Sequence, residues 1–151
     1  MDDSTGMADS QIELSAVDSE PPSDEDEQIL ITDVDTLMHR QINPSPQWIQ
    51  NGVPSSLAFR PSSKDGDCLS VDNGNIHTAQ QAYLCFTSQG YSSAGTWSLT
   101  VGECHAAGVS VHASPVLSNQ AHCCIDFAGK GAKSVAKKLK RKAVARGRQY
   151  P

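Results

Sequence analysis

A short polar stretch holds the densest group of chemistry-bearing side chains in the middle of the chain. Residues 59–65 include two cations and two hydroxyls, namely Arg60, Ser62, Ser63 and Lys64. Arginine presents a planar fork and lysine a point charge, and both suit a phosphate or a carboxylate. The stretch therefore indicates an anionic-ligand site. The alternative is an ordinary polar loop in which Asp65 pairs with a neighbouring cation.

Two predicted strands must position the side chains that would act with this loop. The first, residues 37–42, carries His39 and Arg40, and the second, residues 68–71, carries Ser70. Only three bases lie between residues 36 and 129, and two of them fall within five residues of each other. A site of this kind requires His39, Arg60 and Ser70 to meet in one cleft.

The last 22 residues form a second candidate site, because they carry nine bases and no acid. Ala132, Val135, Ala136 and Leu139 keep helical spacing, so segment 130–151 is predicted to be a basic tail that can form an amphipathic helix. Its basic run can neutralise nucleic-acid phosphates or lie on an anionic membrane. A solvated tail, or one covered by the acidic first segment, is the alternative. The residues of the run are Lys137, Lys138, Lys140, Arg141 and Lys142.

The beginning of the chain has the opposite charge. Residues 1–35 carry twelve acids and no Lys or Arg. Segment 1–28 has few large apolar groups, so its burial cannot offset the entropy of ordering, and we expect it to be disordered. It lacks the pattern of a secretory signal, and no apolar run approaches the roughly 20 residues of a spanning helix. These features predict a cytoplasmic protein without a transmembrane segment.

The five cysteines are odd in number and show no disulfide spacing, which predicts free thiols in a reducing compartment. Zinc-ligand types gather between residues 104 and 124, yet neither Cys-x-x-Cys nor His-Glu-x-x-His occurs, so no metal site is expected. A nucleophile at Cys104, flanked by Glu103 and His105, is the weakest enzymatic alternative. The zinc-ligand types are Cys104, His105, His112, His122, Cys123 and Cys124.

Segment 29–129 is predicted to form one small α+β domain, with about five short strands and one main helix. The helix begins after Thr78, because Thr78 and Gln81 match a capping box. Apolar residues follow at helical spacing, and Gly90 suits the closing position. The apolar residues are Ala79, Ala82, Tyr83 and Phe86, and the predicted strands are 37–42, 68–71, 97–101, 109–111 and 123–127.

Residues 37–127 resemble a family of small, largely uncharacterised bacterial proteins. The stretch 59–65 is the most distinctive part of this resemblance. The resemblance leaves out both charged ends and implies a bacterial, intracellular protein without an established activity. The other stretches that carry it are 39–42, 48–49, 55–58, 69–71, 100–104 and 122–127.

The order of residue types is also similar to the ADP-ribosyltransferase-like folds, including the RNA 2′-phosphotransferases. In those folds a His or Arg on the first strand holds NAD, and a Ser on a following strand supports it. The similarity implies that His39 or Arg40 binds the nicotinamide end, that Ser70 assists, and that Arg60 meets phosphate. Glu103, the only glutamate between residues 36 and 129, would be the catalytic acid.

Three functions are consistent with these features. The first is a binding or interaction protein that needs no cofactor and has an unknown protein partner, with the charged ends tuning its contacts. The second is an NAD-dependent transferase, and the third is a nucleic-acid contact through segment 130–151. The sequence contains no complete catalytic set, so it leaves open whether the protein is an enzyme.

Overall fold

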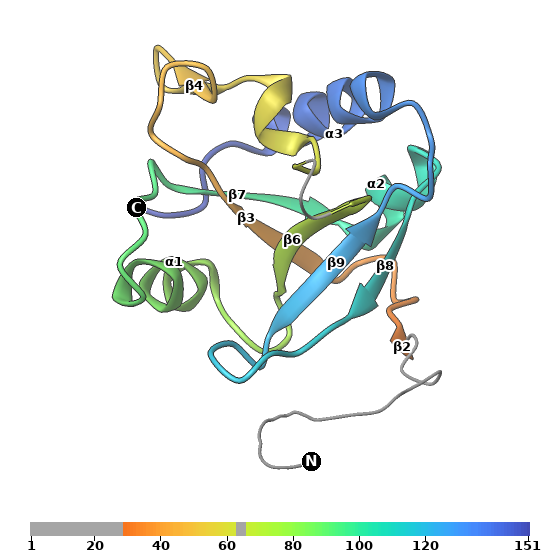
Figure 1. The fold of residues 1–151 in the computed structure, drawn as a ribbon, viewed down its shortest axis with the longest axis horizontal. Coiled ribbons are helices and arrows are strands. Elements are labelled where there is room, and N and C mark those ends of the chain that lie inside the picture. Colours follow the sequence, from red (N-terminus) through yellow and green to blue (C-terminus); the bar gives the residue numbers. More distant parts are fainter. Residues whose placement is uncertain (1–28, 63–65) are drawn as a thin grey trace.

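The computed structural model describes residues 29–62 and 66–151, and it confirms the predicted α+β class. Its centre is a six-stranded sheet in which all neighbouring strands are antiparallel (Figure 1). The predicted disordered segment 1–28 and residues 63–65 lie outside the described residues. The strands are, in spatial order, β2 (Ile29–Leu30), β8 (Ser110–Ala113), β9 (His122–Asp126), β6 (Cys68–Asn73), β3 (Leu37–Gln41) and β7 (Thr96–Thr100).

Helices flank the sheet, and a separate two-stranded hairpin lies beside it (Figure 1). The hairpin turns at Asn51 and Gly52, which have φ angles of 54° and 76°. Positive φ at both positions is typical of the tightest hairpin turns, and the Asn-Gly pair favours them. The other elements are β4 (Ile49–Gln50), β5 (Val53–Pro54), the 3₁₀ helix η1 (Ser56–Phe59), α1 (Ala79–Ser88), α2 (Val101–Ala106) and α3 (Ala132–Arg146).

The apolar face of the sheet carries the core, and α3 covers it (Figure 1). Alternating positions on the strands point toward α3, in keeping with the two-residue period of a strand. The apolar side of α3 is buried among them, so the helix is part of the domain. The main core residues are Met38, Leu69, Val71, Leu99 and Ile125 from the strands, Phe59 from η1, and Val135, Ala136, Leu139 and Ala143 from α3.

This packing corrects the expected organisation of the C-terminal segment. A helix within 130–151 was predicted and is present, but it does not lie outside a domain that ends at Gly129. Leu139 and Ala136 have no exposed surface. The many bases of the segment suggested a solvent-exposed tail rather than a core helix. The bases occupy the outer side of the helix, while its narrow apolar side completes the core.

The opposite face of the sheet is polar, and α1 packs on only one end of it, over β3 and β7 (Figure 1). Strand register places His39 opposite Ser98 and Asp72, and Ser70 opposite Cys124. All of these side chains therefore project from the same face. The candidate site lies on the part of this face over β6 and β9, beyond α1.

The predicted capping box at the start of α1 is confirmed. The Gln81 N–H donates to Thr78 Oγ1 at 3.1 Å, and the Thr78 N–H donates to Gln81 Oε1 at 2.8 Å. Gly90 follows the helix with a φ of 94°, so the predicted left-handed closing position is also correct.

The expectation of free thiols is wrong for two of the five cysteines. Cys68 of β6 and Cys124 of β9 form a disulfide, with their Cα atoms 5.3 Å apart. They are 56 residues apart in the sequence, so only the pairing of the two strands brings them together. Cys85, Cys104 and Cys123 are free.

Two of the free cysteines, Cys104 and Cys123, are buried. Burial raises the pKa of Cys104 to about 12 and that of Cys123 to about 12. A thiol must lose its proton to act as a nucleophile, so this raised pKa disfavours the alternative of a nucleophile at Cys104. Within residues 29–62 and 66–151, no three His, Cys, Asp or Glu side chains are grouped to hold a metal ion. None of the helices in these segments is long and apolar enough to cross a membrane.

Candidate functional site

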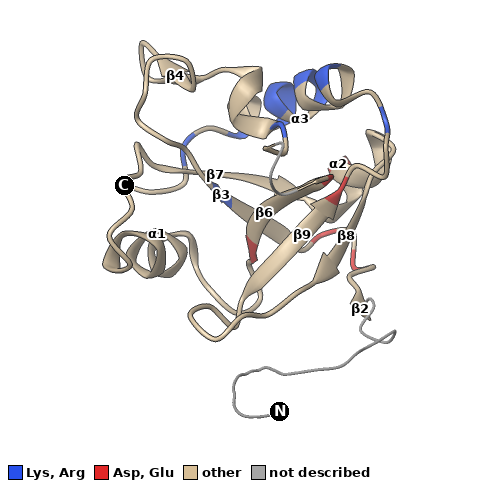
Figure 2. Ribbon diagram, viewed as in Figure 1, with Lys and Arg blue, Asp and Glu red and all other residues tan. Residues whose placement is uncertain are grey.

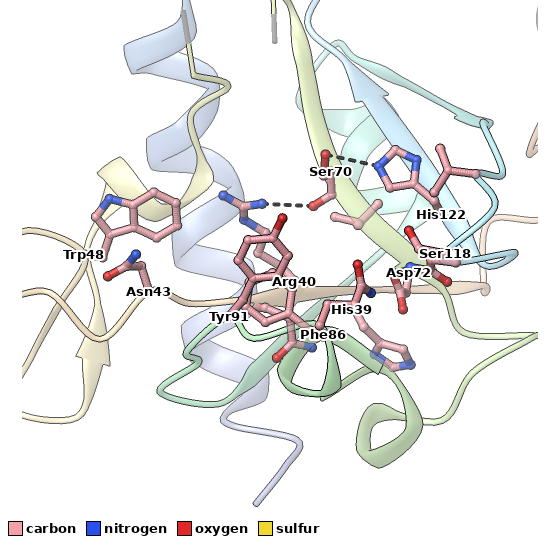
Figure 3. A pocket seen from close by; sticks show the side chains of 15 residues that line it. His39, Arg40, Asn43, Trp48, Ser70, Asp72, Phe86, Tyr91, Ser118 and His122 are labelled. Carbon is pink, nitrogen blue, oxygen red and sulfur yellow. Dashed lines mark hydrogen bonds between the residues drawn. The ribbon is translucent and has the colours of Figure 1, made fainter. Parts of the chain in front are cut away.

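A cleft of about 420 Å³ opens on the polar face of the sheet (Figure 3). The strands β3, β6 and β9 supply its polar wall, and the segments around them supply three aromatic rings. Its volume lies in the range of small-molecule sites, roughly 300–1,000 Å³. We call this hollow the first cleft. Its polar wall includes His39, Arg40, Ser70, Asp72 and His122, and its rings are Trp48, Phe86 and Tyr91.

A second cleft of about 590 Å³ adjoins the first. Arg60, Pro61 and Ser62 line it, together with residues of β6. The two clefts share three lining residues, which are Arg40, Trp48 and Ser70. Because these residues line both clefts, the two clefts lie side by side.

Arg40 is held in place at the junction of the two clefts. Its Nε donates to the Ala58 carbonyl at 2.9 Å, and its Nη1 donates to the Ser70 carbonyl at 3.0 Å. The guanidinium carbon also lies 5.1 Å from the ring centroid of Trp48, within the range of a cation–π contact. Arg40 therefore ties η1 to β6 and fixes a positive charge against an aromatic ring.

Ser70 and His122 form a hydrogen-bonded pair beside Arg40 (Figure 3). The distance from Ser70 Oγ to His122 Nε2 is 3.1 Å. On the other side of the ring, Nδ1 lies 2.9 Å from the Ser114 carbonyl and 2.8 Å from Ser114 Oγ. A carbonyl can only accept, so we assign the neutral ring's proton to Nδ1. Nε2 then accepts from the Ser70 hydroxyl.

His39 and Asp72 are bound to protein groups. His39 is 5% exposed, and its Nδ1 lies 2.7 Å from Ser98 Oγ. Burial lowers the pKa of His39, which favours the neutral imidazole. Asp72 lies 2.9 Å from His77 Nδ1 and accepts a hydrogen bond from Asn119 Nδ2 at 2.8 Å. Both side chains therefore support the wall of the first cleft.

Glu103 lies away from both clefts. It is the third residue of α2 and accepts the Thr100 N–H at 2.9 Å. Arg146 of α3 donates to both carboxylate oxygens, at 2.8 and 2.9 Å. Glu103 thus joins α2 to α3, and the structure does not bring this candidate catalytic acid to the other candidates.

The remaining predicted residues divide into three groups. The structure brings His39, Arg40 and Ser70 together in the first cleft. Arg60 and Ser62 line the neighbouring one, so the three residues expected in one cleft occupy two adjoining clefts. Ser63 and Lys64 lie outside the described residues.

Sequence reasoning missed the contribution of His122. It was considered only as a zinc ligand, beside Cys123 and Cys124. The signal available was the polar residue two positions before Cys124, which the predicted strand 123–127 left out although it lies on the same face of β9. That signal did not reveal the partner, because the register between β6 and β9 decides which side chain meets Ser70.

The predicted basic run lies on α3 (Figure 2), and its exposed residues occupy the side of the helix away from the core. Four residues of the run are exposed, Lys140 is half-buried, and the helix contains no acid. Lys133 adds a further exposed base one turn before the run. We call these six residues the α3 basic face. The exposed residues of the run are Lys137, Lys138, Arg141 and Lys142.

Comparison with known proteins returns no relative. No protein-family model, curated protein or solved structure matches this chain. Its function must be inferred from the clefts and from the α3 basic face.

Proposed function

We propose that this protein binds a dinucleotide of the NAD class across the two adjoining clefts. The observation that carries the proposal is the position of Arg40 and Trp48, which line both hollows. A dinucleotide has two ring-bearing halves joined by phosphates. The two clefts share a cation and an aromatic ring. The shared cation would face the phosphates, and each cleft would hold one ring-bearing half.

The chemistry of the lining supports this ligand class. Trp48, Phe86 and Tyr91 offer ring surfaces in the first cleft, and aromatic rings stack on one another in offset or edge-on geometry. Arg60 in the second cleft suits a phosphate. Arg40 is already oriented by two backbone carbonyls, so little entropy is lost when it meets a ligand.

Calorimetry of the intact chain with NAD tests this function. We expect saturable binding, and we expect Arg60→Ala to weaken it roughly 10- to 100-fold, since a hydrogen bond to a charged group contributes about 1.5–3 kcal/mol. Arg141→Ala is the matched control, because it removes the same charge from the exposed side of α3. The Kd of this control should equal that of the unmodified protein.

Two results would contradict dinucleotide binding. One is the absence of heat at millimolar NAD, which would favour the interaction protein that the sequence first suggested. The other is equal weakening by Arg60→Ala and Arg141→Ala, because that would reflect net charge rather than a phosphate contact in the second cleft.

A second proposed function is binding of nucleic-acid phosphates by the α3 basic face. The observation in its favour is that the apolar residues of α3 are buried in the core, which fixes the bases on the outer side of the helix. A fixed row of cations neutralises phosphates without the cost of ordering a tail. Aromatic side chains are absent from α3, so the contact would be electrostatic.

Charge reversal tests the α3 basic face while preserving the core. We expect Lys137→Glu combined with Arg141→Glu to weaken binding to a short RNA duplex by at least tenfold. The slope of log K against log salt should also fall by about two, since each phosphate contact contributes about 0.9. Lys137→Arg combined with Arg141→Lys preserves the charge and should leave both quantities unchanged. Equal affinity of the reversed and unmodified proteins would contradict the proposal.

A further inference from the structure

We propose that Ser70 and His122 form a base-activated nucleophile that reacts with activated carboxylic esters. The inference goes beyond dinucleotide binding and does not depend on it. It rests on three observations around the first cleft: the hydrogen bond between the two side chains, the orientation of the imidazole, and the position of Ser70.

The hydrogen bond has the geometry that nucleophilic catalysis requires. Ser70 Oγ and His122 Nε2 are 3.1 Å apart, within the range for a nucleophile and its base. The two residues come from neighbouring strands, β6 and β9, and the pairing of Ser70 with Cys124 fixes their relative position. Groups placed on paired strands are held more rigidly than groups on loops.

The imidazole is oriented to accept a proton from Ser70. The carbonyl of Ser114 accepts the Nδ1–H at 2.9 Å, which leaves the Nε2 lone pair directed at the Ser70 hydroxyl. An acceptor on the far nitrogen fixes the tautomer and stabilises the imidazolium that forms during attack. In many hydrolases a carboxylate has this role, and here a backbone carbonyl takes it.

Ser70 is placed where a substrate can reach it, because it lines both clefts. Arg40 donates to the carbonyl of Ser70 at 3.0 Å, so a positive charge lies beside the reacting residue. A fixed cation stabilises the negative charge that develops on the ester oxygen. The aromatic side chains of the first cleft suit an ester of an aromatic alcohol.

The proposed reaction has two steps. In the first, Ser70 Oγ attacks the ester carbonyl carbon while its proton passes to His122 Nε2. The bond from that carbon to the alcohol oxygen then breaks, and the alcohol leaves with the proton from His122. In the second step a water gives a proton to His122 Nε2 and its oxygen bonds to the acyl carbon. The bond from that carbon to Ser70 Oγ then breaks, the proton on His122 passes to Ser70 Oγ, and a carboxylic acid is released.

An alkyl fluorophosphonate probe tests this nucleophile on the intact chain. Ser70 Oγ would attack phosphorus and displace fluoride, leaving one stable adduct in the mass of the protein. We expect peptide mapping to place the adduct on Ser70, and no adduct on the Ser70→Ala protein. Failure of the probe to label the unmodified protein at Ser70, or labelling spread evenly over several serines, would overturn the proposal.

Substitution of His122 distinguishes a base-activated Ser70 from a serine that reacts only because it is exposed. We expect His122→Gln to slow labelling roughly 100-fold or more, the usual contribution of a general base. His105→Gln is the matched control, because it makes the same substitution at an exposed histidine of α2 that lines neither cleft. Its labelling rate should equal that of the unmodified protein, since the substituted ring does not contact Ser70 or His122.

Folding of each variant is checked by its thermal melting before its labelling rate is compared. Equal rates for a folded His122→Gln protein and the unmodified protein would overturn the role of His122. If His122→Gln does not fold, the unmodified protein still decides the question through the site at which the probe reacts. NAD binding is measured separately, so loss of one proposal leaves the other standing.

Discussion

A chain that ends at Gly129 is expected to remain unfolded, although it retains every strand of the sheet. The cut removes α3, whose Val135, Ala136, Leu139 and Ala143 are buried against the strands and η1. Fully burying a Val or Leu side chain contributes about 1.5–3 kcal/mol. The cut would also expose the strand residues under the helix, and the whole stability of a domain is only about 5–15 kcal/mol.

Far-ultraviolet circular dichroism and urea titration of residues 1–129 check this expectation. Leu139→Ala in the intact chain provides a graded version, and we expect it to lower the free energy of unfolding by about 2–5 kcal/mol. Lys137→Ala is the matched control on the exposed side of the same helix, and it should change stability by no more than about 0.5 kcal/mol. A cooperative unfolding transition in the 1–129 protein would contradict the assignment of α3 to the core.

Because α3 is part of the core, deleting it cannot test the α3 basic face. Removal of segment 130–151 would abolish nucleic-acid binding even if the basic residues made no contact, because the domain itself would be lost. Substitutions confined to exposed bases avoid this ambiguity. The structure therefore favours charge reversal over truncation as the test of the second proposed function.

Elements encoded by neighbouring residues could be predicted from the sequence. The capping box of Thr78 and Gln81 predicted the start of α1, because both hydrogen bonds form within one helical turn. Alternation of Trp97 and Leu99 with polar residues predicted β7 in the same way. In each case the signal and the structure lie within a few residues of each other.

Features that depend on strand register could not be predicted. The disulfide between Cys68 and Cys124 and the contact between Ser70 and His122 both follow from the pairing of β6 with β9. A shift of one residue would turn every side chain of a strand to the other face. No local pattern sets this register across more than fifty residues, so the candidate site was found only in part.

The position of Glu103 also depends on a contact between residues far apart in the sequence. As the only glutamate in its part of the sequence, it was considered a catalytic acid. Its carboxylate instead completes a capping box with Thr100 and a two-point ion pair with Arg146. Arg146 lies 43 residues away on α3, and the docking of that helix was the step that the sequence did not reveal.

Substitution of Glu103 by Ala is expected to lower stability by about 3 kcal/mol at neutral pH. The side chains of Glu103 and Arg146 are only 19% and 26% exposed, so removal of one leaves a partly buried, unpaired charge. Breaking such a pair costs about 3–5 kcal/mol when it is fully buried, and loss of a helix cap alone costs about 0.5–2 kcal/mol. Urea unfolding of the two proteins measures the difference.

Glu103→Gln separates the two contributions, because the amide oxygen can still accept the Thr100 N–H while the charge is lost. We expect it to cost about half as much as Glu103→Ala. A double-mutant cycle with Arg146→Ala should give a coupling of at least about 1 kcal/mol. Additive effects of the two substitutions would show that the ion pair does not stabilise the docking of α3.

The pH dependence of stability provides an independent measurement of this ion pair. Burial raises the pKa of Glu103, but the hydrogen bonds from Arg146 and the Thr100 N–H outweigh it and hold the pKa below its usual value. A carboxyl with a lowered pKa stabilises the fold above the pKa of the unfolded chain, about 4.3, and loses that effect as pH falls through its lower folded value. The stability difference between the unmodified protein and Glu103→Gln should therefore be constant near neutral pH and shrink below about pH 4. A difference that persists unchanged in acid would mean that the charge of Glu103 contributes nothing.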